Sequence, residues 1–492
     1  MSSRVQTLAA VRDVLRSADL LTEDHAPEDV AVRGVAQDSR AVVDGDVFVA
    51  WRGTATDAHD FVADAGRQGA AAAIVERRVD APLPQLVVRD GRRAAALVAD
   101  LVLGSPSLEL LTVGVTGTNG KTTTASLVRH ILSPEIPTAV IGTLGLIDDD
   151  GRVRPGTEGL TTPGPVQVAM WLRDLADGGT EAVVLEASSH ALEQARLDGV
   201  RFDVAVFTNL TQDHLDYHGD MAGYLRAKAH LVDLVVDDGT VVLNADERAW
   251  DTLATGDRGV VTFGLDSSAD LRAVDLRMGA AGTSFTLLAG GVEYRVELPL
   301  VGRYNVENAL AAAGAAHAAG IAMERIVERL STTPPVAGRL EPVVSDPFSV
   351  LIDFAHTPAA LEGALQAVRP LTEGRVIVVF GAGGDRDRTK RAPMAETAAR
   401  LADVVVLSSD NPRTEDPEAI IDDLAEAIEG HEYLREADRR KAIRMAIEAA
   451  RPGDTVLLAG KGHESYQVIG TEKQPFDERA IVLDALSGRG AA

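Results

Sequence analysis

The chain has no cysteine among its 492 residues. Disulfide bridges, thiolate zinc sites and cysteine nucleophiles are therefore excluded. Basic residues are outnumbered: 48 lysines and arginines stand against 74 aspartates and glutamates, a formal net charge of −26. A general nucleic-acid-binding protein needs a basic face to neutralise phosphates, so no nucleic-acid partner is expected. A local basic site for a small anion remains open.

Long hydrophobic runs are also absent. No window offers the roughly 20 uninterrupted apolar residues that a membrane-spanning helix needs. Residues 1–21, MSSRVQTLAAVRDVLRSADLL, carry scattered charges and no unbroken apolar core, so they do not resemble a secretory signal. We expect a cytoplasmic protein without a membrane span and, because nothing in the sequence signals an oligomer, a monomer.

The length predicts several domains, because a single core stops growing at roughly 250–300 residues. The segment GSPS at 104–107 has the composition of a linker, and the Pro-rich segment TTPPVAGRLEP at 332–342 marks a second boundary. We therefore predict a small α/β N-terminal domain over 1–105, a central domain over 106–333 and a C-terminal domain over 334–492.

The pattern inside the last two domains is that of an α/β protein. Apolar runs at 110–117, 138–142, 181–188 and 202–210 alternate with helical patterns at 121–132, 165–177 and 223–235. Such alternation indicates a parallel sheet covered on both faces. A β-rich stretch follows at 260–300, and then a helix containing YNVENALAAAGAAHAAG. This predicts a central P-loop parallel-sheet ATPase domain.

The C-terminal domain is predicted to be Rossmann-like. Its four apolar runs each end in a polar cluster: SVLIDFAH, RVIVVFGAGGD, DVVVLSSDNPR and DTVLLAGKGHE. Ligands bind beyond the carboxyl ends of the strands in open α/β sheets. The four clusters therefore predict one composite site.

The segment TGTNGKT at 116–122 is a candidate phosphate-binding turn between a strand and a helix. Backbone N–H groups at such a turn face an anion. Lys121 can reach the β and γ phosphates, and the Thr122 hydroxyl can bind Mg²⁺. The spacing departs from G-x-x-x-x-G-K-[ST], because Val115 stands where the first glycine belongs. An ordinary strand-to-helix turn is the alternative.

A series of motifs, in this order along the chain, resembles those of the Mur ligases. They are TGTNGKT, EASSHAL (186–192), TNLTQDHLDYHGDMAGYLRAK (208–228), GRYNVENALAA (302–312), GRLE (338–341), DFAHTP (353–358), GAGGDRDRTKR (381–391), DNPR (410–413) and GKGHE (460–464). Single motifs are weak, but their number and order cover all three predicted domains.

The resemblance implies an ATP-dependent acid–amino-acid ligase of peptidoglycan precursor synthesis. It points to the branch that adds the third residue of the stem peptide, a UDP-N-acetylmuramoyl-tripeptide synthetase. The implied reaction joins meso-diaminopimelate to UDP-N-acetylmuramoyl-L-alanyl-D-glutamate. A substrate carboxylate takes the γ-phosphate of ATP to form an acyl phosphate, and an amine then displaces phosphate.

The resemblance also assigns residues to ATP. It implies that the nucleotide is bound by Gly117, Thr118, Asn119, Gly120, Lys121, Thr122, Thr123, Asn305, Asn308, Arg339 and Asp353. Phe354 departs from the family pattern, which has tyrosine there, and little consequence is expected. Helix caps and turn acids are the alternatives for the residues outside the phosphate-binding turn.

Four residues are implied to be catalytic: Lys121, Glu186, His214 and Lys228. Thr122 and Glu186 would bind one Mg²⁺, and His214 and Lys228 would serve a second, with Lys228 carbamylated by CO₂ into an anionic oxygen ligand. Without the resemblance, Lys228 would be taken for a surface lysine of a helix and Glu186 for a helix cap. A zinc site at Asp213, Asp216 and His218 is a further alternative, although oxygen ligands and Mg²⁺ suit phosphate chemistry better.

The two other substrates have implied contacts as well. The UDP-sugar peptide would be bound by Ser39, Thr161, Thr162, Ser188, Gln194 and Arg196. Diaminopimelate would be bound by Arg386, Asp410, Asn411, Pro412, Arg413, Gly460 and Glu464. Arg413 offers a planar fork that pairs with a carboxylate, and it would repel the ammonium of lysine. Its alternative role is to stabilise a turn.

Several alternatives stay open. The same ligase could use LL-diaminopimelate or L-lysine, since no residue decides the stereoisomer. A folylpolyglutamate synthase-like ligase shares the ATP chemistry but not the DNPR motif. A nucleotide-gated regulatory protein would show no turnover, and a small-molecule kinase would need no amine. Phosphate release that depends on both substrates would separate these readings.

Overall fold

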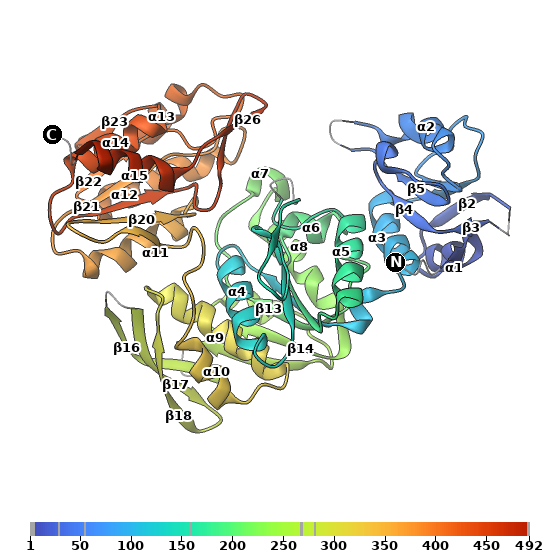
Figure 1. Ribbon diagram of the computed structural model, residues 1–492, viewed down its shortest axis with the longest axis horizontal. Coiled ribbons are helices and arrows are strands. Elements are labelled where there is room, and N and C mark those ends of the chain that lie inside the picture. Colours follow the sequence, from blue (N-terminus) through green and yellow to red (C-terminus); the bar gives the residue numbers. More distant parts are fainter. Residues whose placement is uncertain are drawn as a thin grey trace.

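The computed structural model describes residues 5–27, 30–53, 56–156, 160–265, 269–279 and 282–489. Three main sheets follow one another along the chain, and Figure 1 shows them as a blue, a cyan-to-yellow and an orange-to-red unit, with the middle one lying between the other two. The expected α/β class is confirmed. The domain boundaries at 105/106 and 333/334 stay predictions.

The described residues of the N-terminal unit form a five-stranded sheet. Its strands, in spatial order, are β2 (Leu21–His25), β7 (Gln85–Val88), β6 (Ala72–Val75), β5 (Asp46–Ala50) and β4 (Gly34–Ala36), and only β2 runs antiparallel to its neighbour. The accompanying elements are β1 (Gln6–Thr7), β3 (Ala31–Val32), α1 (Leu8–Ser17), α2 (Val62–Arg67) and α3 (Gly91–Val102). Leu8, Val11 and Leu15 recur at helical spacing and bury one face of α1 in the core.

The central sheet has eleven strands in the described part of the chain. In spatial order they are β11 (Val153–Arg154), β10 (Gly145–Ile147), β9 (Thr138–Gly142), β12 (Ala182–Glu186), β8 (Leu111–Thr116), β13 (Phe202–Phe207), β14 (Val235–Asn244), β15 (Gly259–Gly264), β16 (Leu271–Gly279), β17 (Gly282–Ala289) and β18 (Val292–Leu298). The expected parallel arrangement holds from β9 to β16, but both edges are antiparallel. The two-residue turn between β17 and β18 consists of Gly290 and Gly291, both at positive φ, which is the geometry that a tight hairpin requires.

Helices cover both faces of this sheet. They are α4 (Lys121–Leu132), α5 (Pro165–Gly178), α6 (Ser189–Glu193), α7 (Leu215–His218), α8 (Met221–Asp233), α9 (Arg303–Ala318) and α10 (Met323–Leu330). The α4 bounds match the prediction, whereas α8 begins two residues earlier than expected because Asp220 caps it through the Gly223 N–H. The alanine-rich α9 packs against α4 on one face, and α5 and α8 contribute to the core on the other.

The C-terminal sheet has six strands within residues 334–489, the described part of this unit. Their spatial order is β19 (Glu341–Val344), β20 (Ser349–Asp353), β24 (Thr455–Ala459), β21 (Val376–Phe380), β22 (Val404–Leu407) and β23 (Tyr433–Arg435), all parallel except β19. It is flanked by α11 (Pro358–Val368), α12 (Arg391–Leu401), α13 (Pro417–Glu426), α14 (Arg439–Ala449), α15 (Glu478–Arg489) and the hairpin of β25 (Tyr466–Ile469) and β26 (Glu472–Pro475). Within the described ranges, no helix has the length and apolar character to cross a membrane.

Candidate active site

A cavity of about 490 Å³ lies between the central and C-terminal units. Its walls come from the carboxyl ends of β8, β12 and β13 on one side and of β20, β21, β22 and β24 on the other. The predicted residues that line it are Thr118, Asn119, Gly120, Lys121, Thr122, Thr123, Thr161, Glu186, His214, Asn308, Arg339, Asp353, Arg386, Asp410, Asn411, Arg413, Gly460 and Glu464. The strand ends therefore form a single composite cavity, as expected for parallel sheets.

The turn after β8 has the shape of an anion-binding loop. Gly117 and Gly120 both adopt positive φ, and a Cβ on Gly120 would lie 2.2 Å from the Asn308 Oδ1. The Lys121 Nζ donates to the carbonyl oxygens of Gly117 and Thr118, at 2.8 Å each. Desolvation lowers the pKa of Lys121, although Glu186 and Asp213 oppose the shift. The ammonium therefore spans the turn, where phosphate oxygens can replace the carbonyls.

An oxygen-rich cluster adjoins this turn. Glu186 ends β12 and is 1% exposed. Its Oε2 accepts hydrogen bonds from the hydroxyls of Thr122 and Thr143, at 2.9 Å each. The Arg339 guanidinium donates to the Thr122 hydroxyl at 3.1 Å. A carboxylate and two hydroxyls are the hard ligands that Mg²⁺ takes beside a phosphate.

Lys228 is buried below the turn and does not line the cavity. It is 1% exposed, so the reading as a surface lysine is wrong. Its Nζ donates to the Gly117 carbonyl at 2.8 Å and lies 4.5 Å from the ring centroid of Tyr224. Desolvation and the nearby Lys121 lower its pKa well below the ordinary value. The amine is therefore held in an environment that favours its neutral form.

His214 occupies a left-handed position, with φ at 54°, immediately before α7. Desolvation lowers its pKa to about 3, so the imidazole is neutral at physiological pH and able to bind a metal. The zinc alternative finds no support, since the described residues hold no group of three histidines or acids placed for a metal. His218 instead contacts Glu193 at 2.6 Å and Ser189 at 3.0 Å.

The residues implied to bind adenine and ribose come from α9 and from the segment around β20. Asn308 lines the cavity, whereas Asn305 does not: its amide donates to Val301, and its oxygen accepts from Asn308 at 3.3 Å. The Asp353 carboxylate accepts the backbone N–H groups of Leu340 and Ala355. Asn305 thus orients its neighbour rather than lining the site itself.

Phe354, which departs from the family pattern, lies beside Arg339. The guanidinium carbon of Arg339 is 4.8 Å from the centroid of the phenylalanine ring. A cation over an aromatic face is attracted by the ring quadrupole. This contact requires only the ring, so the missing hydroxyl leaves it intact.

The implied sugar-peptide residues divide between two places. A second cavity, of about 290 Å³, is lined by Gln194 and Arg196 together with Gln37, Trp51 and Arg92 of the N-terminal unit. Thr162 and Ser188 connect it to the main site: the Thr162 hydroxyl donates to the Glu186 carbonyl at 2.6 Å, and Arg196 donates to the Thr162 carbonyl. Ser39 lies in a short 3-10 turn and lines neither cavity.

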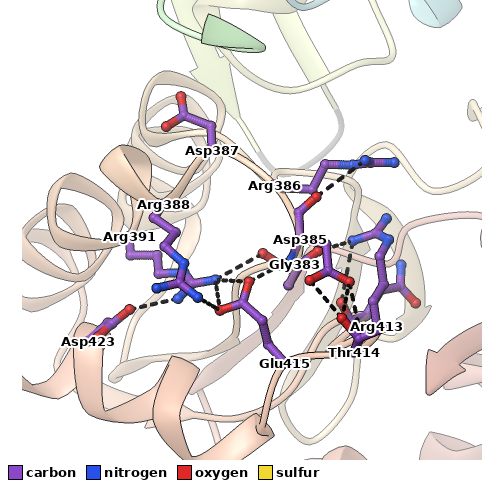
Figure 2. A network of polar contacts seen from close by, with 12 residues as sticks. Gly383, Asp385, Arg386, Asp387, Arg388, Arg391, Arg413, Thr414, Glu415 and Asp423 are labelled. Atoms are coloured by element: carbon purple, nitrogen blue, oxygen red, sulfur yellow. Dashed lines mark hydrogen bonds and ion pairs between the residues drawn. The ribbon is translucent and has the colours of Figure 1, made fainter. Parts of the chain in front are cut away.

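The implied diaminopimelate residues gather at the ends of β21, β22 and β24. Arg413 donates through Nη1 to the Gly384 carbonyl at 2.8 Å (Figure 2). Desolvation and Arg386 lower the pKa of Arg413, while Asp410 and Glu464 oppose this. Among the described residues the buried Asp410 Oδ2 finds no hydrogen-bond partner, which leaves a carboxylate oxygen for an incoming cation. Pro412 is buried outside the cavity lining.

Two buried lysines escaped the sequence reasoning as site residues. Lys461 is fully buried and donates to Asn411 at 2.8 Å and to Glu464 at 2.7 Å. Lys390 of the C-terminal unit lines the cavity, and its Nζ lies 3.6 Å from the Oδ1 of Asp213 in the central unit. Both fall inside matched motifs, GKGHE and GAGGDRDRTKR. Their place in these motifs is the one sequence signal that could have identified them as site residues, because lysine is ordinarily exposed and its residue type alone does not suggest burial.

Comparisons with known proteins place the chain among ligases. Residues 115–316 match the Mur ligase middle domain, and residues 338–462 match the Mur ligase glutamate ligase domain. The chain is 42% identical over 466 residues to UDP-N-acetylmuramoyl-L-alanyl-D-glutamate--2,6-diaminopimelate ligase of Geobacillus kaustophilus (strain HTA426), which covers 92% of this chain and 94% of the relative.

Solved structures agree with this placement. A structure of UDP-N-acetylmuramoyl-L-alanyl-D-glutamate--2,6-diaminopimelate ligase superposes with a TM-score of 0.68 at 33% identity, covering 99% of both chains. The folylpolyglutamate synthase of Mycobacterium tuberculosis, solved with ADP and AMPPCP, superposes with a TM-score of 0.64 at 21% identity and covers 75% of this chain and 92% of its own. That second likeness concerns the fold alone.

Proposed function

The chain belongs to the Mur ligase family, and we propose that it joins 2,6-diaminopimelate to UDP-N-acetylmuramoyl-L-alanyl-D-glutamate with cleavage of ATP. The observation that carries the proposal is the cavity between the central and C-terminal units. One wall holds the candidate phosphate-binding turn with Lys121, and the other holds Arg413 and the Asp410 oxygen that has no partner in the described part of the chain. An activating site and an amine-selecting site thus face each other.

The chemistry requires activation because a carboxylate at neutral pH resists attack by an amine. The substrate carboxylate oxygen bonds to the γ-phosphorus of ATP, and ADP leaves. The amine nitrogen then bonds to the acyl carbon, and inorganic phosphate leaves with the oxygen while the amine loses a proton. The protein contributes mainly orientation and charge neutralisation, and Lys121 and Arg339 supply positive charge beside the phosphates.

Mg²⁺ fits the residues that are present. Thr122 and Glu186 would hold one ion, since their oxygens cluster with the Thr143 hydroxyl. His214 and Lys228 would serve a second. Bound Mg²⁺ would neutralise the charge of the phosphates during transfer. We assign these four residues to metal binding on the chemistry of their donor atoms.

Carbamylation of Lys228 fits its surroundings. CO₂ reacts with a neutral amine: the nitrogen bonds to the carbon and releases a proton. Desolvation favours the neutral amine of Lys228. The carbamate would convert a buried potential cation into an anionic oxygen ligand, which suits a hard metal.

We propose meso-diaminopimelate as the amine, with the LL form and L-lysine as alternatives. Arg413 would pair with the distal carboxylate, which lysine lacks. Asp410 and Glu464 would face the distal ammonium. Since nothing in the sequence signals an oligomer and both ATP and the nucleotide-sugar peptide are small molecules, we propose that the protein acts as a monomer in the cytoplasm.

The test is release of ADP and phosphate by the purified protein. The proposal predicts release only when both UDP-N-acetylmuramoyl-L-alanyl-D-glutamate and diaminopimelate are present, with an amide-linked product. Release without the amine, together with a stable phosphorylated product, would indicate a kinase. Binding of ATP without any turnover would indicate a regulatory protein, and either result would overturn the proposal.

A further inference from the structure

Two loops at adjacent strand ends carry the arginines that face the amino-acid end of the cavity. The Arg386 loop (residues 383–388) follows β21, and the Arg413 turn (residues 411–415) follows β22, its parallel neighbour. Arg386 and Arg413 both line the cavity. Two cations so placed repel each other, as their effect on the pKa of Arg413 indicates, so their separation has to be set by other groups.

The backbone at both places is unusual. Asp385 and Arg413 each have a φ of 52°, in the left-handed region that side chains other than glycine rarely adopt. Such strained conformations persist where several surrounding contacts hold the backbone in place. The Arg413 backbone is bonded on both sides to the β25–β26 hairpin, through Val468 and Gly470. Asp385 is hydrogen-bonded instead to the Arg413 turn, through Thr414 and Glu415.

These hydrogen bonds form a short network (Figure 2). The Asp385 carboxylate accepts the Thr414 N–H at 3.0 Å and the Thr414 hydroxyl at 2.8 Å. The Asp385 N–H in turn donates to the Glu415 Oε1 at 2.6 Å. The Gly384 N–H donates to the Asn411 carbonyl at 2.9 Å. The loop and the turn are therefore bonded together in both directions.

Glu415 is the point at which this network is anchored. Its carboxylate also accepts Arg391 at 2.9 Å and Arg388 at 2.5 Å. The Arg391 side chain is 2% exposed and that of Glu415 12%. Desolvation would raise the pKa of Glu415, but the Asp385 N–H and the two arginines outweigh it and hold the pKa below its ordinary value. Glu415 therefore stays ionised and joins the Arg386 loop to the start of α12.

We propose that Glu415 is a positioning residue for the amino-acid substrate. It fixes the Arg386 loop against the Arg413 turn, and so holds the two cavity arginines at the separation that a substrate carboxylate needs. It touches no substrate itself. The inference rests on the proposed function, since it concerns recognition of diaminopimelate at that site.

The test compares Glu415→Gln with the wild type in the ADP-release assay, varying one substrate at a time. Misplacement of binding groups by about 1 Å can cost up to about 100-fold, so KM for diaminopimelate should rise about 10- to 100-fold. KM for ATP should change less than about twofold, because the phosphate-binding turn lies on the other wall. A merely structural defect would lower the active fraction, and hence kcat, without moving KM for one substrate.

Asp423→Asn is the matched control, because Asp423 binds the other side of Arg391, at 2.6 Å, and is half exposed. It removes a carboxylate from the same arginine without touching the loop, so KM should stay near the wild-type value. Asp385→Asn is the second variant: it keeps a residue that tolerates positive φ but weakens the bonds to Thr414, and it should also raise KM for diaminopimelate.

A rise in KM for diaminopimelate in both loop variants but not in Asp423→Asn supports the inference. An unchanged KM in folded Glu415→Gln and Asp385→Asn, or an equal rise in Asp423→Asn, overturns it while the proposed function stands. If Glu415→Gln fails to fold, as judged by its thermal midpoint, Asp385→Asn decides. A wild-type protein that does not use diaminopimelate would overturn both the proposed function and the positioning role of Glu415.

Discussion

We propose that Arg413 is the residue on which the choice of amine depends. Its guanidinium is partly desolvated, faces Arg386, and is fixed by the Gly384 carbonyl. Within that setting a bidentate carboxylate stabilises it, whereas a second ammonium does not. The DNPR sequence indicated the residue type, but its left-handed backbone and its network of loop contacts are tertiary features that no local pattern shows.

Arg413→Lys should lower kcat/KM for diaminopimelate by about 100-fold, because lysine keeps the charge but loses the planar fork, and a hydrogen bond to a charged group is worth about 1.5–3 kcal/mol. KM for ATP should not change. The matched control is Arg435→Gln, which removes an exposed arginine that pairs with Glu418 and Asp422 in the same unit and should leave activity intact. Steady-state ADP release checks both, and an unchanged kcat/KM in Arg413→Lys would contradict the assignment.

The role proposed for Lys228 places stability and function in conflict at a single residue. Its folded-state pKa lies well below the value of 10.5 that an unfolded lysine has. Between those two values the unfolded chain binds more protons, so the free energy of unfolding rises with pH through this window. At pH values below both pKa values, Lys228 is charged in the folded protein as well, and the full desolvation cost of that charge lowers the free energy of unfolding.

Lys228→Met should therefore raise the thermal midpoint of protein freed of bicarbonate, and the gain should shrink as the pH rises toward 10.5. Turnover should fall by about 100-fold or more, since metal-bound charge stabilisation is worth several kcal/mol. Differential scanning calorimetry at neutral and alkaline pH gives the first quantity and ADP release the second. Near-full turnover, with or without bicarbonate, would refute the metal role.

At the scale of elements, the strand ends and the first turns of helices position the chemistry. The sequence predicted α4 and β9 with their bounds, because strong periodicity and the Gly-Lys-Thr turn agree there. It did not predict that antiparallel strands extend the central sheet at both edges, because hydrophobic alternation does not say which strands are neighbours. Lys390 and Lys461 escaped for a related reason: their partners Asp213 and Asn411 are distant in sequence.

A prediction at this scale concerns Gly142, which ends β9 beside the Glu186 carboxylate. A Cβ on Gly142 would lie 2.2 Å from the Glu186 Oε1. Gly142→Ala should therefore displace the carboxylate without removing any polar group, and it should raise the Mg²⁺ concentration needed for half-maximal ADP release by about 10-fold. Gly178→Ala, in α5 with open space around it, is the control and should be neutral or slightly stabilising. Equal Mg²⁺ dependence in the two variants would contradict the geometry.

At the scale of the whole molecule, the site exists only where two units meet. Arg339 lies between the central and C-terminal sheets and reaches the Thr122 hydroxyl. Gln212 of the central unit donates to Thr389 of the C-terminal unit at 2.9 Å, and Asp213 lies near Lys390 and His356. The sequence motifs predicted one shared site, and most of the predicted site residues line the main cavity of the structure. Ser39 is an exception: the resemblance implied a substrate contact, but in the structure Ser39 lines neither cavity.

Arg339→Ala should weaken binding of a non-hydrolysable ATP analogue about 10- to 100-fold, because a charge-assisted hydrogen bond is worth about 1.5–3 kcal/mol. Arg479→Gln serves as the control, since it removes a partly exposed ion pair with Glu341 on the same connecting segment and should bind the analogue normally. Isothermal titration calorimetry measures both. Equal affinity in the two variants would mean that the nucleotide does not bridge the units.

The most direct test of the account is amine selection by the intact protein. ADP release is measured with ATP, Mg²⁺ and UDP-N-acetylmuramoyl-L-alanyl-D-glutamate, adding meso-diaminopimelate, LL-diaminopimelate or L-lysine at equal concentration. The account predicts the fastest turnover with the meso form, slower turnover with the LL form and none above background with lysine. Preferential use of lysine would contradict the claim that a guanidinium in this cavity selects the amine that the activated carboxylate receives.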